Sequence, residues 1–308
     1  MSGIVGHQAQ QEMFRAAWDQ GKVHHAWLLT GPPGIGKASV AQALARFVLT
    51  DGKGPPHPAL ALIEAGSHPD LRILQRGLND RGALRAEIVV EQIRDLQSLF
   101  QSKPGLGGWR VVVVDAADEM NRSAANAFLK NLEEPPEKTL FLLVSHSPVR
   151  LLPTIRSRCR TLRFQPLADA DVRAVLTREL ADSSAAEVEA LVPLAEGSPG
   201  RALRFAGLDV GKLTEALVGL AKGEGDAMAL AKSLAGKTAQ ARFEAFVELV
   251  PAFIAGAARG RTGASLARAL QLWEKAHALA AEAVPLAYDP QVVAFELAGY
   301  VGELDNPR

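Results

Sequence analysis

The first half of the chain alternates between short runs rich in apolar residues and longer stretches whose apolar residues recur every three or four positions. The short runs predict strands at 26–30, 71–74, 111–114, 140–145 and 161–164. Runs that are apolar over their whole length are typical of strands buried on both faces of a parallel sheet. The longer stretches predict helices at 8–20, 37–49, 90–101 and 123–132. The alternation predicts a doubly wound α/β domain over residues 1–165.

Only helical patterns follow the pair Gln165 and Pro166. They include 171–181, 185–195, 200–207, 239–259, 263–283 and 291–304. The first three predict a small three-helix lid, residues 166–208, because Gly and Pro separate them. The others are rich in Ala and Leu and predict an all-α domain, residues 209–308. No apolar run approaches the roughly 20 residues of a membrane-spanning helix, and the start does not resemble a secretory signal. We therefore expect a cytoplasmic protein.

Composition and charge narrow the class of protein further. The chain has 308 residues, of which 48% are hydrophobic and 22% charged, so it is neither disordered nor a coiled-coil rod. Lys and Arg number 34, as do Asp and Glu, which excludes a basic field over the whole chain but not a local basic face. The single cysteine, Cys159, excludes an internal disulfide and a multi-cysteine zinc site.

A glycine-rich loop between a predicted strand and a predicted helix indicates a phosphate site. Residues 31–39 read GPPGIGKAS, so backbone N–H groups can turn around phosphates and Lys37 can reach them. Its glycines are Gly31, Gly34 and Gly36. The Ser or Thr that ligates Mg²⁺ after the lysine is replaced by Ala38, while Ser39 could touch a phosphate oxygen. A plain Gly/Pro turn is the alternative; a dinucleotide loop is disfavoured because the spacing of the glycines differs.

A predicted strand ending in Asp115 supplies a second acidic position. An acid at the carboxyl end of such a strand matches the Walker B aspartate that holds Mg²⁺. The next residue is Ala116, which can neither accept a proton nor orient water. We interpret Asp118 and Glu119 as a solvated cluster at a helix start. We expect, therefore, a nucleotide pocket that does not hydrolyse ATP by itself.

One arginine is a candidate for acting in the catalytic site of a neighbouring protein. Arg158 lies in Ser157-Arg158-Cys159, on a short segment after the strand that ends at Ser145 and His146, where a phosphate sensor would lie. A guanidinium that is always charged can stabilise a transferring phosphoryl group of a neighbouring molecule. The alternative is that the neighbouring arginines, Arg156, Arg160 and Arg163, form only the solvated face of an edge strand. Cys159 is interpreted as a small buried hydrophobe.

Two motifs resemble the clamp-loader branch of the AAA+ ATPases. They are residues 126–136, NAFLKNLEEPP, and the Ser-Arg-Cys triplet, and the resemblance spans about residues 5–205. Residues 67–71 and 90–94 resemble one subunit type of this branch. A clamp loader is an open ring of five subunits, and the resemblance implies a place at one end of that ring. The resemblance implies that Arg158 reaches the ATP site of the adjacent motor subunit. It also implies that Val5, Gly6 and His7 line the adenine side of a vestigial pocket.

The same resemblance implies a second sensor, cofactor needs and partners. Residues 197–201, GSPGR, match the second sensor, with Arg201 facing the phosphates; an exposed arginine in a helix's first turn is the alternative. We expect that the chain requires no cofactor. Whether the pocket binds ATP or ADP is left open by the sequence. We expect no zinc, because residues 51–68 lack cysteine.

The expected partners are the motor subunits (gamma and tau), the delta subunit, the sliding clamp and primed DNA through the assembled complex, with no membrane. Residues 209–308 would join the collar of the ring. An ATP-hydrolysing motor of replication or recombination, and a P-loop scaffold, are the alternative functions; Ala38 and Ala116 argue against the motor.

Overall fold

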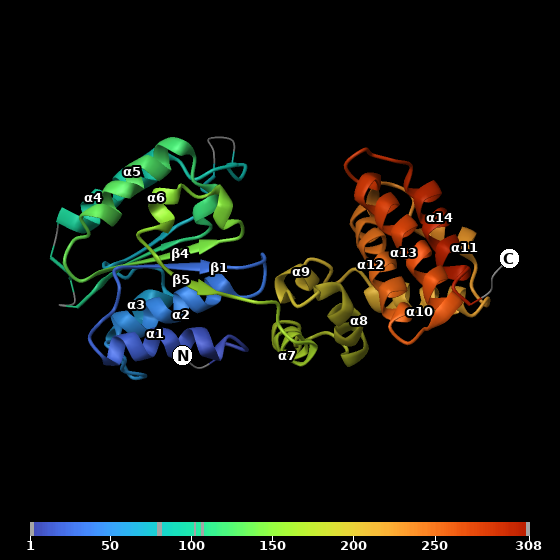
Figure 1. The fold of residues 1–308 in the computed structure, drawn as a ribbon, viewed down its shortest axis with the longest axis horizontal. Helices are drawn as coiled ribbons and strands as arrows, with labels where there is room; N and C mark the ends of the chain where they lie inside the picture. Colours follow the sequence, from blue (N-terminus) through green and yellow to red (C-terminus); the bar gives the residue numbers. More distant parts are fainter. Residues whose placement is uncertain (1–2, 79–81, 102, 106–107, 306–308) are drawn as a thin grey trace. The chain divides into compact units, whose positions relative to one another are not determined.

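The computed structural model describes residues 3–78, 82–101, 103–105 and 108–305. Internal contacts divide the chain into two compact units, Met1–Pro166 and Leu167–Arg308. The first unit holds all the strands and the second is helical (Figure 1). The predicted order, an α/β domain with a parallel sheet followed by helices, is therefore confirmed.

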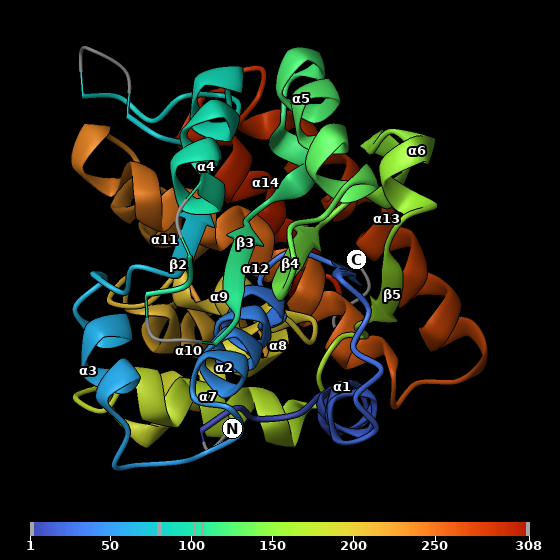
Figure 2. The same cartoon turned by 90° about the vertical axis from the view of Figure 1, so that its left-hand side faces the viewer.

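The first unit is built on a five-stranded sheet in the order β2-β3-β4-β1-β5, in which every pair is parallel. Its strands are β1 (Ala26–Thr30), β2 (Leu71–Leu74), β3 (Arg110–Val114), β4 (Thr139–Ser145) and β5 (Arg160–Arg163). The bounds agree with the predicted ranges to within one residue. Residue Phe164, predicted at the end of the last strand, follows β5, and its N–H donates to the Thr30 carbonyl at 2.7 Å. Figure 2 shows β2, β3 and β4 side by side and β5 at the far edge of the sheet, with β1 between β4 and β5.

Helices cover both faces of this sheet (Figure 1). They are α1 (Gln8–Asp19), α2 (Lys37–Leu49), α3 (Pro58–Glu64), α4 (Val90–Gln101), α5 (Arg122–Glu133) and α6 (Pro153–Arg156), with short 3₁₀ turns at Ala117–Glu119 and Pro148–Arg150. Alternate residues of β3 enter opposite cores, because successive side chains of a strand point to opposite faces. Val111 and Val113 pack with α1 and α2, whereas Val112 and Val114 pack with α4 and α5. Both faces are thus buried, which explains the four consecutive valines.

The second unit is a helical assembly around one continuous apolar core. Its helices are α7 (Asp169–Glu179), α8 (Ala185–Ala195), α9 (Pro199–Leu203), α10 (Val210–Ala221), α11 (Ala227–Ser233), α12 (Gln240–Ala258), α13 (Gly263–Ala283) and α14 (Pro290–Gly302), with a 3₁₀ turn at Lys237–Ala239. The core includes residues from Val172 in α7 to Leu304 after α14. The further division of this part into a lid and a collar at residue 208 stays a prediction. Within the described residues, no helix combines the length and apolarity needed to cross a membrane.

We expect Gly31→Ala to destabilise the first unit, because Gly31 leaves β1 in close contact with the end of β5. A Cβ at this position would lie 2.5 Å from the Phe164 carbonyl oxygen, and the backbone φ is +152°. Such overpacking costs about 1–3 kcal/mol of unfolding free energy. Denaturant unfolding followed by tryptophan fluorescence measures it. Gly54→Ala is the control, since no heavy atom lies within 4 Å of its added Cβ. Equal unfolding midpoints for the two variants would contradict the expectation.

Candidate functional site

The glycine-rich loop lies between the end of β1 and the start of α2, at the carboxyl edge of the sheet. Gly31, Gly34 and Gly36 all have positive φ, and Gly36 caps α2 in the left-handed region at +98°. Ile35 is buried and anchors the loop in the core that contains α1 and α2. The loop therefore has the strand–turn–helix setting that the sequence predicted for a phosphate site. Ser39 is exposed in the first turn of α2, and its contact with a phosphate stays a prediction.

The side chain of Lys37 folds back into this loop. Its ammonium nitrogen donates to the carbonyl oxygens of Gly31 and Pro32 at 2.7 and 2.5 Å, and only 2% of the residue is exposed. Burial lowers the pKa of Lys37 to about 8, although the charges of Asp118 and Asp115 act in the opposite direction. The positive charge that would meet phosphates is thus held by the loop itself.

His7 packs against the same loop from the segment before α1. Its Nε2 lies 2.7 Å from the Ile35 carbonyl oxygen, and its ring meets the Phe164 ring edge-on with the centroids 4.8 Å apart. The residue has a left-handed backbone, φ +58°, at the N-cap of α1. The structure thus brings the predicted Val5–His7 segment to the loop through His7. Contact with an adenine stays a prediction.

Asp115 follows β3 at the same edge of the sheet. Its N–H donates to the Leu74 carbonyl at 2.8 Å, which continues the pairing of β3 with β2. Burial raises the pKa of Asp115, while His146 and Lys37 favour its charged form. A cavity of about 310 Å³ lies beside it. The cavity is lined by Gln75, Arg76, Leu84, Asp115, Ala116, Glu119 and His146. Asp115 thus lies at the end of a buried parallel strand, as the sequence predicted, and its role as a Walker B aspartate stays a prediction. Ala116 after it is buried.

The interpretation of Asp118 as a solvated residue is wrong. Asp118 is buried, and its two carboxylate oxygens accept the backbone N–H groups of His146 and Ser147 at 2.9 and 3.2 Å. It therefore holds the turn after β4 against the turn after β3. Glu119 instead pairs with Arg76 at 2.9 Å, with both side chains about one-third exposed (28% and 36%). The sequence could not reveal the role of Asp118, because the backbone groups that it binds lie in another segment.

Arg158 lies between α6 and β5, on elements separate from the phosphate loop. Its Nη2 forms an ion pair with Glu133 at 2.9 Å, and its Nη1 donates to the Thr154 carbonyl at 3.0 Å. Cys159 beside it is half-buried rather than fully buried; it packs against the core, and burial raises the pKa of its thiol to about 12. Arg160 is exposed and lies 4.9 Å from the Trp27 ring centroid.

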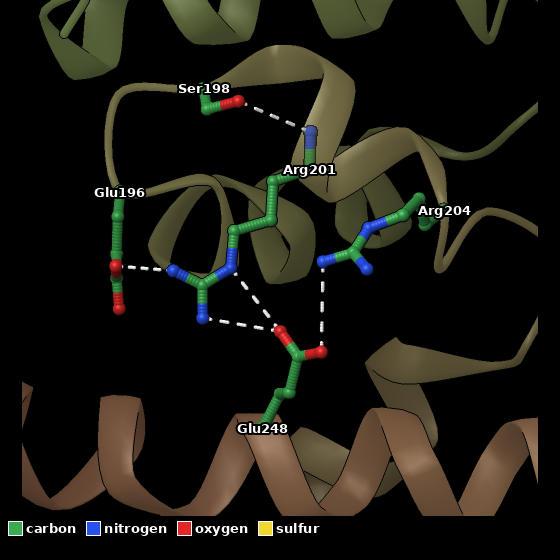
Figure 3. A network of polar contacts seen from close by, with 5 residues as sticks. All are labelled: Glu196, Ser198, Arg201, Arg204 and Glu248. Atoms are coloured by element: carbon green, nitrogen blue, oxygen red, sulfur yellow. Dashed lines mark hydrogen bonds and ion pairs between the residues drawn. The ribbon is translucent and has the colours of Figure 1, made fainter. Parts of the chain in front are cut away.

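Arg201 belongs to the helical unit, where carboxylates surround its guanidinium (Figure 3). Its Nε and Nη2 donate to the same Glu248 oxygen at 3.2 and 3.1 Å, and Nη1 pairs with Glu196. Arg204 approaches the other Glu248 oxygen at 3.6 Å. Glu248 comes from α12, whereas both arginines follow Ser198, which caps α9. The structure thus connects α9 with α12 through charge, and the predicted role of Arg201 at phosphates stays a prediction.

The histidines of the segment expected to lack zinc have local partners. The Nδ1 of His57 accepts the Ala59 N–H at the start of α3, and the Nδ1 of His68 accepts the Asp70 N–H. Within the described ranges, no group of three or more His, Cys, Asp or Glu side chains could hold a metal ion.

Comparison with known proteins gives one family match and several related chains. The family described as "DNA polymerase III, delta subunit" matches residues 6–168. The protein named DNA polymerase III subunit delta' of Pseudomonas aeruginosa is 39% identical over 65% of this chain and 61% of its own length. The delta' proteins of Escherichia coli and Bacillus subtilis are 37% and 41% identical, over 62% and 48% of this chain and 57% and 44% of their own lengths. The matches thus span about three fifths or less of these relatives.

Solved structures are similar only at low identity. A DNA polymerase III gamma subunit-related protein of Thermotoga maritima is 19% identical, with a TM-score of 0.49, over 96% of this chain and 100% of its own. A RuvB variant of Thermotoga maritima is 16% identical, with a TM-score of 0.47, over 96% and 87%. Similarity at such low identities and TM-scores does not indicate a function.

We expect Lys37 to give the unfolding free energy a distinct pH dependence. The pKa of Lys37 is lowered from 10.5 to about 8 on folding, so the unfolded state binds more protons between these values. The destabilisation caused by the buried charge is fully present near neutral pH and is lost as the pH rises through this window. Relative to Lys37→Met, the wild type should gain about 2.5 kcal/mol between about pH 7 and about pH 10.

Denaturant unfolding at several pH values measures this gain. Lys53→Met is the matched control, because the Lys53 side chain is 70% exposed. A difference between wild type and Lys37→Met that stays constant with pH would show that the ammonium is not buried as described.

The link between Arg201 and Glu248 should contribute measurably to the stability of the helical unit. Both side chains are about one-third exposed, at 30% and 33%. A double-mutant cycle with Arg201→Ala and Glu248→Ala should give a coupling energy of about 1 kcal/mol, decreasing with added salt. The pair Arg178 and Glu179 is the control, because it is more exposed and joins adjacent residues. If the coupling energies of the two pairs are equal, the contact does not connect α9 with α12 energetically.

Proposed function

Because the chain belongs to the family described as "DNA polymerase III, delta subunit", we propose that it serves as the delta-prime subunit of a DNA polymerase III clamp loader. In this proposal it helps place the sliding clamp on primed DNA. It does not turn over ATP itself, and Arg158 stabilises the transferring phosphoryl group in the ATP site of the adjacent motor subunit. The names of its relatives, subunit delta' in three bacteria, support this choice within the family.

One observation carries the absence of ATP turnover in this proposal: alanines occupy both positions next to the retained charges. Lys37 and Asp115 are in place, but Ala38 replaces the Mg²⁺-ligating hydroxyl and Ala116 replaces the carboxylate that would orient water. Removing such a group costs several kcal/mol of transition-state stabilisation, so losing both leaves little catalysis.

The role of Arg158 is supported by how its segment is held. Ile155 is fully buried, and Cys159 packs into the same core, so the residues on both sides of the arginine are anchored. The Arg158 side chain itself is 36% exposed and open to another molecule. A guanidinium fixed at a surface in this way suits stabilisation of charge in a neighbouring ATP site.

The proposed partners are the gamma and tau motor subunits, the delta subunit and the clamp. The helical unit exposes several apolar side chains in α14 and in the segment between α13 and α14, which supports a contact with another protein in the collar. They are Val284, Leu286, Tyr288, Val292 and Phe295, each at least 39% exposed. The zero net charge fits a chain whose main contacts are with proteins, with DNA held by the whole ring.

The proposal predicts that Arg158→Ala lowers the ATPase of a reconstituted complex. The complex contains the motor and delta subunits, and clamp and primed DNA stimulate it. Turnover should fall by about 10³-fold at the site that Arg158 serves, which is the contribution of an arginine finger. Arg156→Ala is the control, because Arg156 is an exposed arginine of the same segment. Unchanged stimulated turnover with Arg158→Ala would refute the finger and favour a scaffold.

The isolated chain separates this proposal from the alternative, an ATP-hydrolysing motor. We expect no phosphate release above background from the purified protein. Robust release that disappears in Lys37→Ala would favour a motor of the gamma or tau type.

A further inference from the structure

The guanidinium of Arg158 is held at two points before any partner is bound. Nη2 pairs with Glu133 at 2.9 Å, and Nη1 donates to the Thr154 carbonyl at 3.0 Å. An arginine has five N–H donors. The two contacts leave three of them without a partner among the described residues. The side chain is therefore oriented and still able to donate to another molecule.

Glu133 stands at an unfavourable place for a carboxylate. It is the last residue of α5, where the helix dipole favours positive charge. Its backbone is fixed, because Leu132 before it is buried in the core and Pro135 follows closely. The Glu133 side chain thus starts from a fixed helix end beside Arg158.

Stability does not account for this pair. Its side chains are 36% and 48% exposed, and ion pairs of such exposure contribute little to folding. Glu134, the next residue, is also exposed, and it has no ion pair among the described residues. Glu133 and Glu134 are thus both exposed, and only Glu133 contacts Arg158 among the described residues.

We infer that Glu133 is a positioning residue for Arg158, an inference that rests on the proposed function. Ordering a long side chain in advance removes part of the conformational entropy that would be lost when the arginine enters a neighbouring ATP site. The carboxylate and the Thr154 carbonyl hold one part of the guanidinium, and the free N–H groups meet the phosphoryl oxygens. Glu133 acts through Arg158 and touches no reacting atom.

The test measures steady-state ATP turnover of the reconstituted complex with motor subunits, delta subunit, clamp and primed DNA. Glu133→Ala should lower kcat by about fivefold, the factor expected of a pair of this exposure. The KM for ATP should stay unchanged, because ATP is bound by the motor subunit. Glu133→Gln should retain intermediate turnover, since its amide oxygen can still accept from the guanidinium. Glu134→Ala is the matched control and should equal the wild type.

A double variant decides whether Glu133 acts through the arginine. In the Arg158→Ala background, adding Glu133→Ala should change nothing further. The inference is overturned if Glu133→Ala equals Glu134→Ala, if it raises kcat, or if it lowers turnover further when Arg158 is already absent. Should Arg158→Ala alone leave turnover unchanged, the proposed function fails instead. Assembly of each complex, measured by gel filtration, and Glu133→Gln keep the test valid if Glu133→Ala folds poorly.

Discussion

The parallel pairing of β1 with β4 and of β3 with β4 places Lys37, His146 and Asp115 at one edge of the sheet. Thr30 is in register with Ser145, so the glycine-rich loop and the turn at His146 leave the sheet side by side. Val114 pairs with Leu143, which brings Asp115 to the same edge. If this register slipped by one residue, the side chains of β3 would change face and Asp115 would leave its place beside the loop. The site therefore persists as long as the fold does.

This dependence explains how the site can keep its shape with alanine at positions 38 and 116. Lys37 is held by loop carbonyls, and Asp118 is held by the N–H groups of the turn after β4. Each contact satisfies buried polar groups of the protein itself, so removal of either partner would leave a buried group unsatisfied. A hydroxyl or carboxylate that only binds or activates a ligand does not satisfy a buried group of the protein. Alanine at positions 38 and 116 leaves these internal contacts intact.

The sequence was sufficient wherever the deciding interactions are local. The strands and the glycine-rich loop follow from residue periodicity and spacing, and the strands were predicted to within one residue. The helices α1, α2, α4, α5, α8, α12 and α13 were predicted equally well, whereas the bounds of α7, α9 and α14 differ by one to four residues. The errors and omissions share a different cause. Asp118 binds backbone groups 28 and 29 residues away, and Arg201 binds Glu248 across 47 residues. No periodicity signals such contacts. Helices α3, α6, α10 and α11 also lie outside the predicted ranges; α3 and α11 have only seven residues and α6 has four, too few for a clear helical period.

Strand β5 limits how one copy of this fold can join another. It lies at an edge of the sheet, is only four residues long, and exposes Arg160 and Arg163. Short edges with charged side chains resist addition of a strand from another chain. The opposite edge, β2, is equally short. Sheets of adjacent molecules therefore do not fuse into one continuous sheet, and any ring must be joined through helices and loops. In the proposed complex, the contacts between neighbouring subunits would then be made by side chains and could change without breaking a shared sheet.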